Sequence, residues 1–293
     1  MFAEEWPLMM FTLFSQLAVG SFVILLLIRT VLSQKNTESA NKITGFGMKQ
    51  VGWIMIFAFV CSLFHLGTPT GAYRSLYHLA SSWLSREILT AGAFFVLWLV
   101  TRSALKKGSS ATALAWVTAL VGLIVVYSMA SIYTNSVRPA WANINTFVAF
   151  YGATFAMGTA GALSFMAYGA KGTQISGEVS GSLKNISLTA GVSVLVPLLY
   201  LPVFISSLKK GVSAAQTSAQ LLSGSYMLPL ILGVIISLVG AVLLYLGFSK
   251  SGKSVNTLPV SKIYLGFLLL FVGEFVARYV FYGTAVSIMI GLK

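Results

Sequence analysis

The sequence predicts an all-α integral membrane protein, with eight transmembrane helices packed in one bundle. Of its 293 residues, 57% are hydrophobic and only 9% are charged, whereas about 25% of the residues in soluble domains are charged. Apolar runs of the length that crosses a bilayer, about 20 residues, recur along the whole chain. No polar block between them is large enough to fold alone, so residues 1–293 are expected to form a single membrane domain.

The first four spans are predicted at residues 8–32, 48–66, 86–105 and 112–132. The chain before the first run carries acidic residues and no basic residue. This is the reverse of a signal peptide, so the run is expected to be retained as a span. Gly67 and Pro69 end the second span, because both residue types break helices. Ser85 is the expected N-cap of the third helix, which places Glu87 in its first turn, where a carboxylate complements the helix dipole.

The second four spans are predicted at residues 146–168, 186–208, 227–248 and 263–282. The fifth contains Gly158 and Gly161, small residues that let neighbouring helices approach closely. Pro197 and Pro202 predict a kink in the sixth, since proline lacks an N–H donor and clashes with the preceding turn. The seventh carries no charge, whereas the eighth contains both an acid and a base.

Basic residues indicate how the bundle is oriented. Of the 19 Lys and Arg residues, twelve lie at the odd-numbered loops and six at the even-numbered loops and the termini. Cytoplasmic loops are enriched in Lys and Arg. The odd-numbered loops are therefore expected in the cytoplasm, and both termini on the periplasmic side.

Composition also disfavours several classes of function. The net charge is +13, but the basic residues are scattered over short loops without interleaved aromatics, which disfavours nucleic acid as a partner. The one cysteine, Cys61, has no partner for a disulfide, a CxxC metal site or an iron–sulfur cluster, and is interpreted as a small buried apolar residue. Neither histidine is central in a span, so no metal site and no bis-histidine haem is expected in this protein.

Chemistry-bearing residues gather between the second and third spans, in a segment with both histidines and one of the six carboxylates. His65 ends the second span and could accept a proton from a quinol hydroxyl. The alternative is an interfacial histidine that satisfies backbone carbonyls. Glu87 opens the third helix at the same level, so the two could form a proton-release pair, although the helix dipole offers Glu87 a structural role. His78 lies in the loop, where a solvated role is expected.

Three further polar residues lie inside spans, where polar groups are costly and functional candidates by default. Glu274 and Arg278 are four residues apart, on one helix face and close enough to pair. They form either a structural ion pair or the border of a polar cavity. Gln16 lies at a similar depth, roughly 12 Å from the outer end at about 1.5 Å per residue. Its amide can be satisfied by another helix or by a quinone carbonyl.

Four motifs resemble the membrane anchor subunit of bacterial dimethyl sulfoxide reductase, the DmsC family, within the wider group of NrfD-like quinol-handling subunits. They are residues 5–16 (EWPLMMFTLFSQ), 62–69 (SLFHLGTP), 84–88 (LSREI) and 273–283 (GEFVARYVFYG). The resemblance spans most of the chain, although the fifth to seventh spans are similar mainly in hydropathy.

The resemblance implies an anchor in the bacterial cytoplasmic membrane that oxidises menaquinol near the outer face. Its implied partners, on the periplasmic side, are a ferredoxin-like four-cluster iron–sulfur subunit and a molybdopterin catalytic subunit. The family's quinol-site histidine and carboxylate fall on His65 and Glu87. Gly71 stands where some relatives carry a base, and Arg74 is the nearest substitute. The expected quinol pocket comprises Gln16, His65, Arg74, Glu87, Glu274 and Arg278.

Two other functions compete with this interpretation. A secondary transporter would use Glu274, Arg278 and the proline-containing sixth span as a midplane site. The polar residues cluster toward one face instead, and no inverted repeat is evident. A purely structural anchor would have no quinol site, and a change at His65 would then leave quinol-dependent turnover intact.

Overall fold

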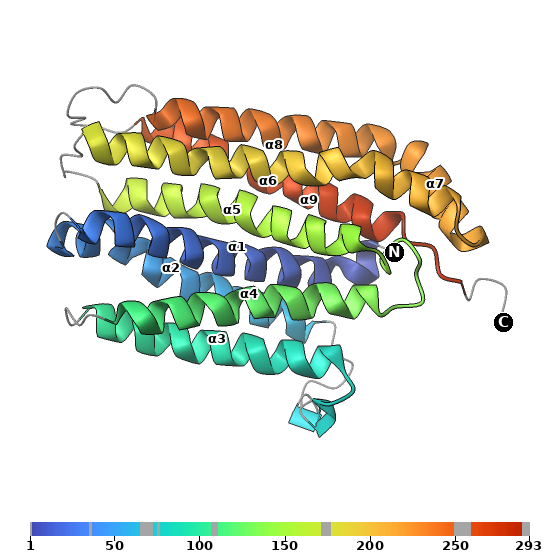
Figure 1. The fold of residues 1–293 in the computed structure, drawn as a ribbon, viewed down its shortest axis with the longest axis horizontal. Helices are drawn as coiled ribbons and strands as arrows, with labels where there is room; N and C mark the ends of the chain where they lie inside the picture. The colour runs from blue at the N-terminus through green and yellow to red at the C-terminus, as the bar shows by residue number, and fades with distance from the viewer. Residues whose placement is uncertain are drawn as a thin grey trace.

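The structure, a computed structural model, describes residues 2–34, 37–64, 73–74, 77–106, 111–170, 177–248 and 259–288. This part of the chain forms nine α-helices and no strand (Figure 1). Eight of these helices are long and apolar enough to cross a membrane, which confirms the predicted fold class. The helices are α1 (Phe2–Ser33), α2 (Thr37–Leu63), α3 (Trp83–Lys106), α4 (Thr112–Thr134), α5 (Ile144–Gly169), α6 (Gly177–Lys209), α7 (Ser213–Ser223), α8 (Met227–Phe248) and α9 (Val260–Gly283).

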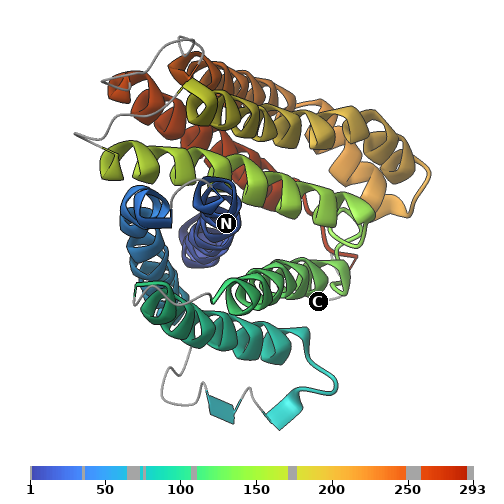
Figure 2. The ribbon, with the colours of Figure 1, turned by 60° about the vertical axis from the view of Figure 1, so that its left-hand side comes forward.

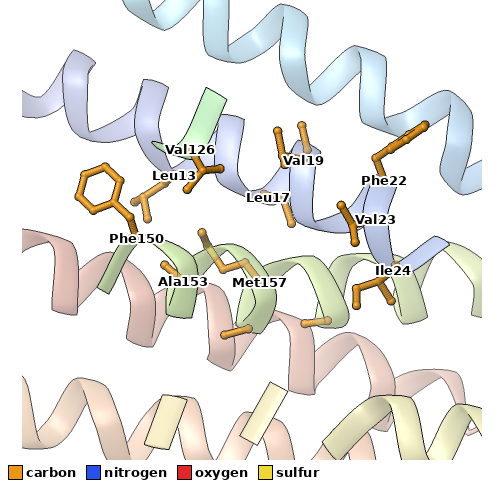
Figure 3. Packing of buried hydrophobic residues seen from close by; sticks show 14 of the residues in the cluster. Leu13, Leu17, Val19, Phe22, Val23, Ile24, Val126, Phe150, Ala153 and Met157 are labelled. Carbon is orange, nitrogen blue, oxygen red and sulfur yellow. The ribbon is translucent and has the colours of Figure 1, made fainter. Parts of the chain in front are cut away.

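Helix α1 is the centre of the bundle. In its most apolar stretch 89% of the residues are buried, against 22% in α9. Figure 2 shows α1 enclosed by α2, α4 and α5, and it also contacts α9. Its apolar side chains, including Leu13 and Leu17, meet Val126 of α4 and Phe150 and Met157 of α5 in a continuous core (Figure 3). Most side chains of α1 therefore pack against protein instead of lipid.

The predicted glycine packing is confirmed where α1 crosses α5. A side chain on Gly158 would place its Cβ 2.3 Å from the backbone of Gly20, and one on Gly161 would meet Ser21 Oγ at 2.6 Å. Backbone atoms cannot move aside as a flexible side chain can. The two helices approach this closely only because small residues face each other, as expected for helix packing within a membrane.

Helices α3 and α4 close the bundle on one side of α1. They are joined by a 2.7 Å hydrogen bond between the buried hydroxyls of Thr101 and Thr118. The indole of Trp98 reaches across to α2 and donates to the carbonyl of Met48 at 2.8 Å. Each of these polar groups is thus satisfied inside the bundle, as a hydrocarbon surrounding requires.

Helices α6, α8 and α9 lie on the opposite side of α5 from α1–α4 (Figure 1). Pro197 and Pro202 are both inside α6, which continues through them. Gly152 of α5 lies against the first proline: a Cβ at this position would stand 2.9 Å from the carbonyl oxygen of Ser193. That carbonyl is the one whose helical donor Pro197 lacks. A small residue on α5 therefore accommodates the close approach of α6 at Pro197.

Two helices begin well before their predicted starts. Helix α2 begins at Thr37 and α6 at Gly177, so that Lys42 and Lys184, expected in loops, are helical. The buried guanidinium of Arg29 on α1 donates to the side chain of Asn41 and ties the polar start of α2 to the bundle. Hydropathy reports the stretch that suits hydrocarbon, and a helix can extend beyond it.

Helix α7 has no counterpart among the predicted spans. It is short, and it buries Ala215, Ser218, Ala219 and Leu222 at the end of the bundle where α1 begins. The backbone N–H of Val286 donates to Ser218 Oγ at 3.1 Å, so the segment after α9 is bound to α7. Helices α1 and α9 begin and end, respectively, at this same end, here called the α7 end (Figure 1). Its assignment to the periplasmic side remains a prediction.

Candidate functional site

The central polar contact of the α7 end joins the first and last helices. Arg278 Nη2 of α9 donates to Gln16 Oε1 of α1 at 2.7 Å. Both side chains are buried, with 4% and 0% of their surface exposed. The guanidinium also lies over the ring of Phe150, 3.9 Å from its centroid. The amide partner expected for Gln16 is thus another helix, supplied by Arg278.

The expected pairing of Glu274 with Arg278 does not form as an ion pair. Within the described residues, no hydrogen bond or ion pair joins the two side chains, and Arg278 bonds to Gln16 instead. The carboxylate and the guanidinium still interact electrostatically. Their spacing of one helical turn places them on the same face. The hydrogen-bond partner of the guanidinium is therefore on α1 and not on its own helix.

Two buried nitrogens at this contact have no hydrogen-bond partner within the part of the chain that the structure describes. They are Arg278 Nη1 and Gln16 Nε2. Most buried polar atoms in folded proteins are paired, so an unpaired one calls for an explanation such as an absent ligand or water. Nη1 belongs to a cation inside a membrane span, where an unmet donor is especially costly.

Glu274 and Arg278 line a cavity of about 130 Å³ between α5, α6, α8 and α9. Its wall is mainly apolar, and part of it is formed by small residues such as Ala149, Ala153 and Ala277. Asn145 and Ser237 add polar groups to the wall. The full lining is Ala140, Trp141, Asn145, Ala149, Ala153, Val194, Pro197, Leu198, Leu201, Phe204, Leu222, Leu230, Gly233, Val234, Ser237, Gly273, Glu274, Ala277, Arg278, Val280, Phe281 and Thr284. Glu274 and Arg278 thus border a cavity, but its wall is mainly apolar, and the polar cavity expected beside them stays a prediction.

Glu87 lies on α3, and its local setting differs from the prediction. Helix α3 begins at Trp83, so Glu87 is beyond the first turn. Ser82 is the capping residue: its hydroxyl accepts from the backbone N–H of Ser85 at 3.3 Å. Ser85 itself is helical and buried, so its assignment as the N-cap was wrong. Since the dipole effect fades beyond the first turn, it no longer explains a Glu87 side chain that is only 3% exposed.

A buried tyrosine pair lies between Glu87 and Arg278. The hydroxyls of Tyr133 on α4 and Tyr282 on α9 form a short hydrogen bond. The Tyr133 hydroxyl interacts electrostatically with both Glu87 and Arg278. Polar groups from α1, α3, α4 and α9 are therefore gathered at the α7 end.

The loop residues of the prediction lie apart from this buried group. Arg74 and His78 are exposed, and the Arg74 guanidinium is 5.9 Å from the centre of the Tyr73 ring. His65, with Gly67, Pro69 and Gly71, lies outside the described residues. The preceding residue, Phe64, has its ring 5.8 Å from that of Trp6 at the start of α1. Cys61 is buried, as expected for a small apolar residue.

The tyrosine pair and Phe150 were missed by sequence reasoning. Tyr282 carried a usable signal, because positions 274, 278 and 282 repeat every four residues and share one helix face. Tyr133 carried none, since it ends an apolar run and resembles any interfacial aromatic residue. Among the described residues, no group of three or more His, Cys, Asp or Glu side chains is placed to hold a metal ion.

Comparison with known proteins shows the family. The family model described as DMSO reductase anchor subunit (DmsC) matches residues 1–284. The Escherichia coli (strain K12) protein named as the C chain of anaerobic dimethyl sulfoxide reductase is 30% identical over 302 aligned positions, which cover 97% of the present sequence and 96% of that protein. The Haemophilus influenzae protein of the same name is 33% identical over 151 positions, covering 50% of the present sequence and 53% of that protein. The protein therefore belongs to the DMSO reductase anchor subunit (DmsC) family and is a membrane anchor of a DMSO reductase complex.

Proposed function

We propose that this anchor oxidises menaquinol at the α7 end of the bundle and passes the electrons to an iron–sulfur partner subunit. That subunit transfers them to a molybdopterin catalytic subunit. The observation that supports the proposal is the group of buried polar side chains, drawn from four helices, at that one end. It includes a carboxylate, Glu87, for which the described residues offer no capping or ion-pairing role. Buried ionisable groups within membrane spans are functional candidates by default.

The chemistry requires acceptors for two protons. A quinol that becomes a quinone releases two electrons and two protons, and the electrons leave for the partner's nearest cluster. Glu87 can accept a proton as a carboxylate, and the neighbouring Tyr133 can accept and donate through its hydroxyl. His65 is proposed as the second acceptor, because it follows directly on Phe64, which lies against Trp6 at this end.

The chain is proposed to act as one membrane domain in the bacterial cytoplasmic membrane, with the partners docked on the periplasmic side at the α7 end. The excess of Lys and Arg at the opposite end supports this orientation. Protons would then be released on the side where the sulfoxide is reduced, so quinol oxidation by this subunit would contribute little to the proton gradient. A reporter fusion that placed the termini in the cytoplasm would contradict this orientation.

Quinol-dependent turnover of the purified complex tests the proposal. Glu87→Gln keeps the side-chain volume and removes the base, so menaquinol-dependent reduction of the sulfoxide should fall about a hundredfold, within the usual range for a lost proton-transfer group. Turnover with a soluble reduced dye that feeds the partner subunits directly should be unchanged. Glu38→Gln, at an exposed carboxylate at the start of α2, is the matched control.

A purely structural anchor makes the opposite prediction. Normal menaquinol-dependent turnover and normal binding of a quinol-analogue inhibitor in both the Glu87→Gln and the His65→Arg complexes would refute the quinol site. The transporter alternative also expected Glu274, Arg278 and Pro197 around one cavity, and they do line one. Membership of the anchor-subunit family removes the need for that interpretation.

A further inference from the structure

The cavity beside Glu274 is separated from Glu87 by other helices. Its walls are α5, α6, α8 and α9, whereas Glu87 is on α3, which packs against α4 and α2. The tyrosine pair joins α4 to α9, and Tyr133 interacts electrostatically with both Glu87 and Arg278. We propose that the cavity is a second binding site of the protein, one that takes the aromatic ring of a quinol or quinone. This inference rests on the proposed function in one respect, that the complex handles quinols.

The size of the cavity suits a single ring. Its volume is about 130 Å³, and an apolar cavity of about 150 Å³ engineered in another protein binds benzene. The space exists because small residues stand where larger ones would fill it. Ala149 and Ala153 of α5 and Ala277 of α9 are among the residues that line it.

The polar groups of the wall match the two oxygens of a quinol ring. Arg278 can donate to a ring oxygen, and its Nη1 has no partner among the described residues. The half-buried Glu274 can accept from a ring hydroxyl, and Asn145 and Ser237 can do either. A lipid acyl chain would leave all of these groups unsatisfied. The site therefore favours a ligand with an apolar ring and hydrogen-bonding oxygens.

The guanidinium is held in position before any ligand arrives. Nη2 is bound to Gln16, and the ring of Phe150 covers one face of the group. A second ring, that of Phe281, lies 5.6 Å away. Binding therefore need not order a flexible arginine, which removes one of the usual entropic costs of recognition.

The rim of the cavity provides a route for an apolar tail. Leu198 and Leu201 of α6 and Leu230 of α8 line the cavity and are only partly buried. These residues belong to membrane spans. The cavity thus borders the lipid-facing surface between α6 and α8, where an isoprenoid tail can leave into the bilayer.

A photoreactive short-chain quinone tests the inference on the purified complex in lipid nanodiscs. We expect cross-links to α6 and α9 peptides that line the cavity, and competition by added menaquinol. Ala277→Leu fills the cavity and should reduce this labelling at least tenfold. Leu268→Phe adds volume on the outer face of the same helix, where 55% of the side chain is exposed, and should leave labelling unchanged. Glu274→Gln keeps the volume and should weaken binding of the probe severalfold.

The outcomes separate this site from the proposed function. Labelling that Ala277→Leu does not reduce, or that is confined to the segment of residues 61–87, would overturn the second site while leaving quinol oxidation at Glu87 intact. Loss of menaquinol-dependent turnover in Glu87→Gln with cavity labelling retained supports both. Cavity labelling with normal turnover in the Glu87→Gln and His65→Arg complexes would refute the proposed site of oxidation only. Iron and molybdenum content shows that each variant complex has assembled.

Discussion

The contact between Gln16 and Arg278 makes the sharpest prediction for stability. Gln16→Leu keeps a volume similar to that of glutamine but removes the oxygen that accepts from Arg278 Nη2 at 2.7 Å. Both terminal nitrogens of a buried guanidinium would then lack a partner, since Nη1 already has none within the described residues. Hydrogen bonds to charged groups are worth about 1.5–3 kcal/mol. Neutral interhelical bonds in membranes average only about 0.6 kcal/mol.

Because the donor is charged and buried, the expected loss is closer to the range for charged groups than to the average for neutral interhelical bonds. We expect Gln16→Leu to lower the free energy of unfolding of the full-length chain, titrated in mixed micelles, by about 2 kcal/mol. The Phe150 ring still faces the cation at 3.9 Å, which limits the loss. In an Arg278→Met background the same substitution should cost less than about 0.5 kcal/mol, because no cation is left unsatisfied.

A double-mutant cycle thus decides whether the contact contributes as described. Equal losses from Gln16→Leu in the wild-type and Arg278→Met backgrounds would refute the reasoning, since the coupling energy would then be zero. Gln34→Leu, at an exposed glutamine just after α1, is the control for the change of residue type.

Three further predictions concern the helices around the site. Tyr133→Phe should destabilise the protein by about 1 kcal/mol, because it leaves the Tyr282 hydroxyl without its partner, and adding Tyr282→Phe should cost little more; additive losses in the micelle titration would contradict this. Gly158→Ala should prevent close packing of α1 on α5 and reduce the yield of assembled complex, whereas Gly92→Ala, with open space around it, should be neutral or stabilising by up to about 1 kcal/mol. Ser82→Ala should lower the free energy of unfolding by about 1 kcal/mol through loss of the cap on α3, and an unchanged value would refute that capping role.

The positions of the spans were predictable because the cost of placing a side chain in hydrocarbon depends mainly on its own residue type. Each of the eight predicted runs overlaps one of the long apolar helices. The boundaries were less predictable, since the polar first turns of α2 are stabilised by Arg29 and not by lipid. Helix α7 was missed because it, too, is stabilised by protein contacts that hydropathy does not reveal. It is too short and too polar to span, and its helical form depends on packing against the end of the bundle.

The residues of the candidate site were largely predictable, but the contacts between them were not. Gln16, Glu274 and Arg278 stand out in any apolar span, because polar groups there are costly. Glu87 was identified by its position level with His65 and by the family resemblance, and its burial was shown by the structure. Tyr133 shows the limit of this approach. A tyrosine at the end of a span is common, and only the position of α9 gives it a partner.

By itself, the sequence determined the membrane class, the number of spans and the small set of polar side chains that the membrane interior must accommodate. These properties depend on residue type and on local spacing. The tertiary structure alone decided that Arg278 bonds to Gln16 and not to Glu274, that Ser82 and not Ser85 caps α3, and that a ring-sized cavity lies beside Glu274. The physical reason is that the partners of a buried group are chosen by how helices pack, and Gln16 and Arg278 are 262 residues apart.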